Sequence, residues 1–226
     1  LQLALRVLDR GGFGGIKQPV RLGAERRAVI TGAQHVEWLV SSHPDWPMPA
    51  WATAKAFAWT MTGNMDSAEE ALVSSDGAVA PWARAPRAEV WLYDPETGRL
   101  GAAGPADVRF SLTDGRLPMP QWEWEALGIS VRNTLFGDGG QAAVRWKITV
   151  QNTDAEPRSL TLLMAIRPFA INQNLAPICA IRAHRGRQLW VNDVPFMAAA
   201  TAAGETGAAL LPESMAAAMR GRGPTG

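Results

Sequence analysis

Two carboxylates, Glu123 and Glu125, are the residues of this chain whose type and spacing best suit catalysis. Glycosidases use two carboxyl groups, about 5–5.5 Å apart for retention and about 6.5–9.5 Å apart for inversion. Residues two apart on a strand lie on one face, about 7 Å from each other. Because Trp122 and Trp124 would occupy the opposite face, we interpret the glutamates as the solvated side of a sheet. We therefore predict no catalytic residue in this chain.

Other residue types that carry chemistry are few. Cys179 is the single cysteine, which excludes an intrachain disulfide and a cysteine-based zinc site, and we expect it to be a buried, inert thiol. The three histidines, His35, His43 and His184, lack the spacing of metal ligands. The glycine-rich stretch at residues 11–15 lacks the third glycine of a dinucleotide fingerprint. We predict no metal and no cofactor.

The composition indicates a globular domain with a large core: 226 residues, of which 47% are hydrophobic and 19% are charged. The net charge of +1 gives no field that would steer a nucleic acid or an anionic membrane. No apolar run approaches the roughly 20 residues of a membrane span. We therefore expect a soluble chain without a nucleic-acid or membrane partner, in the cytoplasm or the periplasm. Ten tryptophans against one tyrosine fit a thick β-sandwich core or sugar-stacking surfaces.

Alternating polar and apolar residues, interrupted by Asp-Gly and Gly-Gly turns, predict a mainly β fold: an antiparallel β-sandwich with one or two short helices. Ala50 to Thr62 is rich in helix formers and predicts a short helix, whereas residues 64–87 read as a loop. The expected strands lie at residues 27–31, 35–40, 89–93, 107–113, 121–125, 129–136, 144–151, 160–166, 178–183 and 188–191.

The same pattern divides the chain into three parts. Residues 1–87 hold N-terminal strands, a short helix and loops, and residues 88–197 form the antiparallel sandwich. Residues 198–226 are rich in Ala and Gly and are expected to be a linker, with one short helix near residues 213–219, or the start of a next domain. Because the chain opens on Leu1 without an initiator Met, we expect a piece of a larger protein.

Four residues are expected to have structural roles. Trp122, Trp124 and Trp146 belong to the inward faces of their strands, so we place them in the core. Arg167 ends a strand that is apolar on both faces and should lie centrally in a sheet, so its charge must be paired or hydrogen-bonded. We expect Arg167 to support the loop at residues 172–174.

Five residues are candidates for binding a ligand. Trp91 and Tyr93 share a face with Glu89, while Val90 and Leu92 supply the inward face, so the two rings could form an exposed platform for a sugar. The three adjacent amides of the next loop suit the recognition of sugar hydroxyls, although amides also stabilise turns for their own sake. They are Asn172, Gln173 and Asn174.

Three segments carry a family resemblance: Leu117 to Trp124, Val150 to Asp154, and Leu160 to Asn172, which includes the Arg-Pro-Phe-x-x-Asn element Arg167–Asn172. They resemble the N-terminal β-sandwich region, with its galactose-mutarotase-like supersandwich, of large bacterial proteins related to the six-hairpin glycosidases. The resemblance implies that such a sandwich packs against an (α/α) barrel of the same polypeptide, and that the barrel carries the catalytic carboxylates. No catalytic residue of that family maps onto this chain.

Three hypotheses follow. The first is a non-catalytic domain of a larger glycoside hydrolase-like enzyme, which braces a helical barrel and has its catalytic residues outside this chain. The alternative is a stand-alone carbohydrate-binding module that holds an oligosaccharide. The third is a self-contained hydrolase that uses Glu123 or Glu125 with Asp107 or Asp138.

Overall fold

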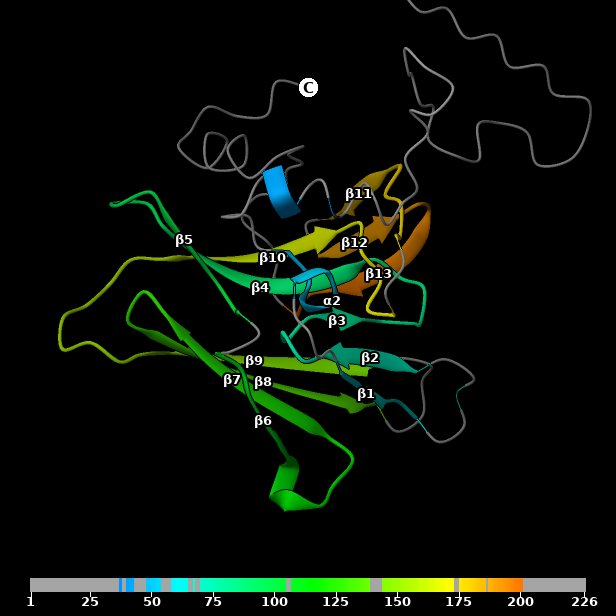
Figure 1. Ribbon diagram of the computed structural model, residues 1–226, viewed down its shortest axis with the longest axis horizontal. Coiled ribbons are helices and arrows are strands. Elements are labelled where there is room, and N and C mark those ends of the chain that lie inside the picture. The colour runs from blue at the N-terminus through cyan, green and yellow to red at the C-terminus, as the bar shows by residue number, and fades with distance from the viewer. Residues whose placement is uncertain are drawn as a thin grey trace, which may run out of the picture.

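The computed structural model describes residues 37, 40–42, 48–53, 58–64, 67, 70–104, 107–138, 144–172, 175–185 and 187–200. These residues form a mainly β structure whose strands pair antiparallel, as the alternating pattern predicts (Figure 1). The expected strand at residues 27–31 and the expected helix near residues 213–219 lie outside the described residues.

The first sheet has the strand order β1-β2-β3-β4-β10, and β5 pairs with β4 beside this path (Figure 1). Its strands are β1 (Trp59–Thr62), β2 (Ala71–Ser74), β3 (Val79–Ala80), β4 (Arg87–Asp94), β5 (Arg99–Ala102) and β10 (Thr161–Arg167). Strands from both sides of residue 87 pair in this sheet, so the division expected there runs through one continuous sheet.

The structure corrects three local expectations in this sheet. The loop predicted for residues 64–87 contains β2 and β3, whose short apolar runs are buried and therefore show no alternation. The helix predicted from Ala50 to Thr62 is present as α2 (Ala50–Thr53), but the last four residues of the predicted range pair with β2 as β1. The strand expected at residues 35–40 is helical at residue 37 and at residues 40–42.

The position of β10 in the sheet also differs from the prediction. It was expected to lie centrally because it is apolar on both faces, but among the described strands it pairs with β4 alone and ends the sheet. Leu162 on β10 is 48% exposed. A strand with apolar residues on both faces can thus lie at the edge of a sheet, where part of its apolar surface remains in contact with water.

The second sheet is a meander of consecutive strands in the order β6-β7-β8-β9. Its elements are β6 (Arg109–Leu112), the 3₁₀ helix η1 (Thr113–Gly115), β7 (Pro120–Ala126), β8 (Ile129–Gly137) and β9 (Val144–Asn152). The β7–β8 hairpin turns through Leu127 and Gly128, which both have positive φ as a two-residue hairpin turn requires.

A third, smaller sheet contains β11 (Ile181–His184), β12 (Gln188–Val191) and β13 (Val194–Ala198). The expected pairing of β11 with β12 is confirmed, with Ile181 opposite Val191. Asn192 and Asp193 form the β12–β13 turn with φ of 52° and 63°, a conformation that Asn and Asp tolerate better than other residues with side chains. Val191 and Phe196 are buried against residues of the first sheet in a second apolar cluster.

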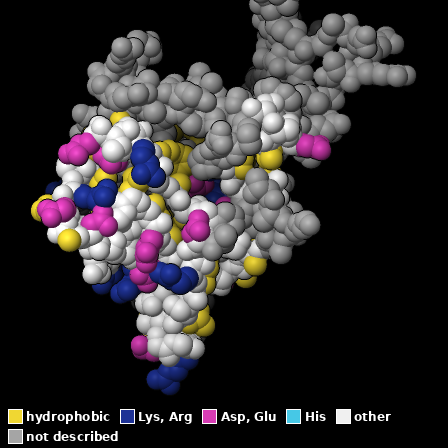
Figure 2. Space-filling model, turned by 60° about the vertical axis from the view of Figure 1, so that its left-hand side comes forward, with side chains coloured by type: hydrophobic (Ala, Val, Ile, Leu, Met, Phe, Trp, Pro, Cys, Tyr) yellow, Lys and Arg dark blue, Asp and Glu magenta, His cyan; other side chains and the backbone are white. Residues whose placement is uncertain are grey.

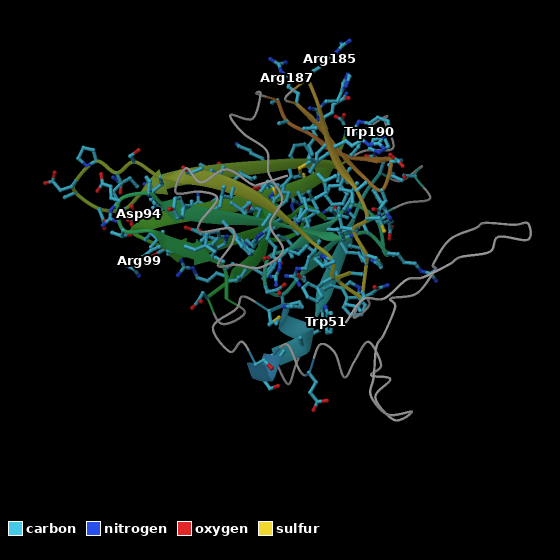
Figure 3. The ribbon with its side chains drawn as sticks, turned by 90° about the horizontal axis from the view of Figure 1, so that it is seen from above. Trp51, Asp94, Arg99, Arg185, Arg187 and Trp190 are labelled. Carbon is cyan, nitrogen blue, oxygen red and sulfur yellow. The ribbon has the colours of Figure 1, made fainter. Side chains whose placement is uncertain are left out.

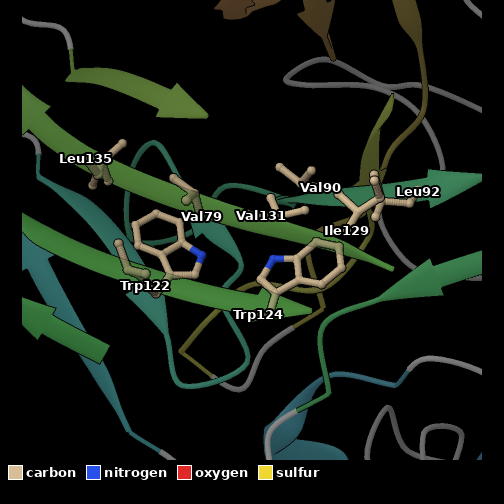
Figure 4. Packing of buried hydrophobic residues seen from close by; sticks show 10 residues of the cluster. Val79, Val90, Leu92, Trp122, Trp124, Ile129, Val131 and Leu135 are labelled. Carbon is tan, nitrogen blue, oxygen red and sulfur yellow. The ribbon is translucent and has the colours of Figure 1, made fainter. Parts of the chain in front are cut away.

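The main core joins the first two sheets in a sandwich-like arrangement. Trp122 and Trp124 of β7 lie among Val79, Val90 and Leu92 of the first sheet, and they are 1% and 2% exposed (Figure 4). Because strand neighbours alternate, the same β7 segment presents its glutamates on the opposite face. Two indoles on one short strand supply a large share of the apolar area buried here.

We expect Leu135→Ala to lower the free energy of unfolding by about 3 kcal/mol, because Leu135 is fully buried in the main core and its truncation leaves a cavity. Leu162→Ala removes the same atoms from a side chain that is 48% exposed, so its effect should stay below about 1 kcal/mol. Urea unfolding of the two variants measures the difference. Equal losses would contradict the location of the core between the two sheets.

Candidate functional site

A cluster of charged side chains lies where β4 meets β10 and the β2–β3 turn. All eight residues of β4 are buried, although the strand carries Arg87 and Glu89. Alternation places these two side chains and Trp91 on one face of the strand. Arg167 of β10 is the direct cross-strand partner of Arg87, and Asp76 belongs to the β2–β3 turn. The fold thus brings together charges that are 78 residues apart in the sequence.

Every charge in this cluster has an opposite charge in contact. Arg87 Nη2 lies 2.6 Å from Asp76 Oδ2, and its Nε lies 2.5 Å from Glu89 Oε1. Arg167 Nη1 donates to both carboxylate oxygens of Glu89, at 3.1 and 3.2 Å, and Trp91 Nε1 donates to Glu89 Oε2 at 2.8 Å. The two arginines and the two acids balance in formal charge, which allows their burial.

Electrostatics keep Arg87 charged. Burial alone would lower the pKa of the Arg87 guanidinium, but the Glu89 and Asp76 carboxylates and their hydrogen bonds raise that pKa above its ordinary value. A guanidinium held this way neither gives nor takes a proton near neutral pH. Arg87 is therefore suited to fixing structure and not to acid–base catalysis.

Aromatic rings enclose Arg167, the residue predicted to need a partner. Its guanidinium carbon lies 5.6 Å from the centre of the Trp91 ring and 5.2 Å from the centre of the Phe169 ring. Phe169 in turn packs edge-on against Trp51 of α2 at 6.0 Å, and Trp51 Nε1 donates to the carbonyl of Ala170 at 3.1 Å. The Arg-Pro-Phe element thus attaches α2 to the end of β10.

The amide loop predicted to bind a ligand follows directly. A bridge between Phe169 and Leu175 closes it, and Ala176 N donates to the carbonyl of Pro168 at 2.9 Å. Asn172 is half-buried within this loop, and Gln173 and Asn174 lie outside the described residues. Phe169, whose ring centre lies 5.2 Å from the Arg167 guanidinium carbon, belongs to the base of this loop. The support of residues 172–174 by Arg167 stays a prediction.

The prediction of an exposed aromatic platform is wrong. Trp91 and Tyr93 are 4% and 2% exposed, so neither ring offers a surface on which a sugar could stack. The reason is that β4 is covered on both faces, with Val90 and Leu92 in the main core and Trp91 under Arg167. Of the structural tryptophans, Trp122 and Trp124 lie in the core, and Trp146 packs partly buried against it with its Nε1 donating to Asn133 Oδ1 at 3.0 Å.

The paired glutamates occupy the outer face of the second sheet, as expected. Glu123 accepts from the Ser130 hydroxyl at 2.8 Å and lies 3.4 Å from Arg132, while Arg109 lies 3.0 Å from Glu125. The Ser130 hydrogen bond, opposed by partial burial and aided by Arg132, lowers the pKa of Glu123. A general acid of a glycosidase needs a raised pKa, so this environment opposes the self-contained hydrolase.

A shallow hollow of about 120 Å³ lies beside these residues, bordered by Arg109, Glu123 and Arg132. Sites for drug-sized ligands enclose roughly 300–1,000 Å³, so this hollow is too small to hold an oligosaccharide. Within the described parts of the chain, no group of three or more His, Cys, Asp or Glu residues could hold a metal ion. None of the helices in those parts has the length and hydropathy that crossing a bilayer needs.

Two further sequence predictions concern single residues. Cys179 was expected to be buried but is exposed, because the segment that leads into β11 lies on the surface. His184 ends β11 and is exposed, whereas His35 and His43 lie outside the described residues, as do the glycines at residues 11–15.

Sequence reasoning missed the central members of the cluster, Asp76, Arg87 and Glu89. A signal was present, because Arg87 and Glu89 alternate with apolar residues and lead into Trp91, a face that the pattern assigned to solvent. In a sequence that alternates with period two, a solvated polar face and a face of buried ion pairs have the same pattern. The partner Asp76 could not be identified, since its turn was read as part of a loop.

No protein-family model matches this chain, and no curated protein matches it.

Arg87→Ala is expected to cost about 3–5 kcal/mol in the free energy of unfolding, because it leaves Asp76 and Glu89 buried with fewer partners. Arg109→Ala breaks an ion pair whose side chains are 68% and 56% exposed, and should cost less than about 1 kcal/mol. Denaturant unfolding of both variants gives the comparison. If Arg87→Ala were as mild as Arg109→Ala, the cluster would not stabilise the fold.

Ser130→Ala is expected to raise the pKa of Glu123 toward the ordinary glutamate value, because the Ser130 hydroxyl contributes most to lowering it. A carboxyl whose pKa is lowered in the folded state stabilises the protein at neutral pH, and this contribution disappears as the pH falls through the folded pKa. The variant should therefore lose less stability on acidification. A carbon-13 NMR titration measures the pKa, with Thr134→Val as the control. A Glu123 pKa above the ordinary value in the parent chain would contradict this assignment.

Proposed function

We propose that the chain is a non-catalytic β-sandwich domain of a larger, carbohydrate-active, glycoside hydrolase-like enzyme, and that it braces a helical barrel of the same polypeptide. The observation that carries the proposal is the uncovered edge of the main core at β6. Phe110 and Leu112 pair with Trp122 and Pro120, so they project on the core side of the sheet, yet they are 42% and 43% exposed.

Geometry at this edge favours a packing surface. The Phe110 ring stacks on the Trp122 ring with centroids 6.1 Å apart and an angle of 22°, so the core continues to the surface at this point. β6 is the terminal strand of its sheet in the described structure and has no exposed acid to shield its apolar side. Apolar surface that extends a core in this way is typical of contacts between domains.

The charged residues of the described structure favour a structural role for the domain. The buried charges are mutually neutralised, and Glu123 has a pKa shifted away from that of a general acid. The assignment to the carbohydrate-active class rests on the resemblance of Leu160–Asn172 and its neighbouring segments. The stand-alone carbohydrate-binding module loses its expected platform with the burial of Trp91 and Tyr93.

Phe110→Ser/Leu112→Ser is expected to reduce the fluorescence of the dye ANS bound to the 226-residue chain, since the double variant removes the exposed apolar edge. In the longer polypeptide that carries the barrel, the same variant should lower the Tm of the assembled protein. Ser111→Ala, on the opposite face of β6, is the matched control and should change neither quantity. A reading frame around the chain that encodes no helix-rich domain would overturn the proposal.

A further inference from the structure

The tip of the β11–β12 hairpin carries two exposed arginines, Arg185 and Arg187, which are two positions apart in the sequence (Figure 3). We call this pair the arginine tip. On β11, Arg182 adds a third cation, whose side chain is 71% exposed and lies 3.0 Å from Asp193. Three arginines against one carboxylate leave this hairpin with a net positive charge in a chain whose net charge is only +1.

The arginine tip differs in charge pairing from most of the other arginines in the described residues. Most of those in the described residues lie within 4 Å of a carboxylate: Arg87, Arg109, Arg132, Arg145, Arg158, Arg167 and Arg182. Neither arginine of the tip has such a partner in the part of the chain that the structure describes. On the face that Figure 2 shows, acidic and basic side chains are intermixed, as this pairing implies. The tip is thus a concentration of charge that the fold itself leaves uncompensated.

The backbone at the tip adds a second observation. Arg185 has a φ of 52°, in the left-handed region where Gly, Asn and Asp are favoured, and Arg187 N closes the turn on the His184 carbonyl at 3.2 Å. This conformation is less favourable for arginine than for glycine. The turn holds Arg185 and Arg187 at the exposed end of the hairpin.

An indole lies on the same hairpin. Trp190 of β12 is directly opposite Arg182 of β11, so the two side chains share a face, and Trp190 is half-buried. The next residue, Val191, projects to the other face and is 3% exposed in the second apolar cluster. This buried contact anchors the hairpin, so the face with Arg182 and Trp190 is presented from a fixed scaffold.

We propose that this hairpin binds an acidic polysaccharide through its uronate carboxylates. The guanidinium groups of Arg182, Arg185 and Arg187 match a carboxylate in charge and in planar hydrogen-bonding geometry. The exposed part of the Trp190 ring offers an apolar surface against which a sugar ring can pack. Arg182 beside Trp190 can therefore contact both halves of an acidic sugar, the charged group and the apolar ring face, and the arginine tip extends the positive charge to the end of the hairpin.

A polyuronate fits this surface better than a nucleic acid does. Nucleic-acid binding draws on many phosphate contacts along a basic surface, whereas this positive charge is confined to one hairpin. The choice of a saccharide among polyanions rests on the carbohydrate class in the proposed function. The binding surface itself does not, because β6 and β11 lie at opposite ends of the structure (Figure 1).

Calorimetric titration of the 226-residue chain with oligogalacturonate tests the proposal. We expect binding that is lost when the uronates are methyl-esterified, which keeps the sugar and removes the charge. Arg185→Ser/Arg187→Ser should weaken binding at least about fivefold, since two exposed ion pairs are lost. Both residues are exposed, and circular dichroism checks that the variant remains folded.

The matched control is Arg99→Ser, which removes an exposed, unpaired arginine from β5, far from the arginine tip (Figure 3). It should bind oligogalacturonate as the parent chain does. The proposal fails if the parent chain does not bind oligogalacturonate, if the tip variant binds unchanged, if Arg99→Ser is weakened as much, or if a single-stranded oligonucleotide binds more tightly. Failure here leaves the β6 result unaffected, because the Phe110→Ser/Leu112→Ser experiment measures a different surface.

Discussion

The neutralisation of charge on a buried strand is the constraint on which much of this structure depends. β4 is buried along its whole length, yet it carries Arg87 and Glu89, and a buried charge without a partner is far more costly than an exposed one. The strand can therefore be covered only if the β2–β3 turn brings Asp76 and β10 brings Arg167. Ion pairing thus links three segments that are distant in sequence, and it fixes which strands may flank β4.

That constraint explains the limits of what the sequence predicts. The antiparallel meander from β6 to β9 could be predicted, because polar and apolar residues alternate along its strands and each strand follows the previous one in the chain. β4 was predicted as a strand, but the burial of its charged face was not, since a period-two pattern does not distinguish water from an ion pair. The misplaced platform of Trp91 and Tyr93 has this cause. Asp76 was missed for another reason, because its turn was read as part of a loop.

A related limit applies to the segment before β4. β2 and β3 are short, apolar and buried, and their residues show no alternation that would separate them from a loop with turn residues. β1 was read as the end of a helix because it follows a segment rich in alanine, whereas its own residues pair with β2. In both cases the decisive information is the long-range partner strand, which a local pattern does not contain.

The surface has two separate regions that suit contacts with other molecules, the exposed apolar edge at β6 and the arginine tip. At β6 the core reaches solvent through Phe110 and Leu112, which favours a dry contact with another domain. At the β11–β12 hairpin, Arg185 and Arg187 have no carboxylate within 4 Å among the residues that the structure describes, which favours a negatively charged ligand. A contact that buries β6 would leave the arginine tip accessible at the other end of the structure. A bracing domain can therefore hold a polysaccharide at the same time, because the two roles use different sheets and different physical interactions.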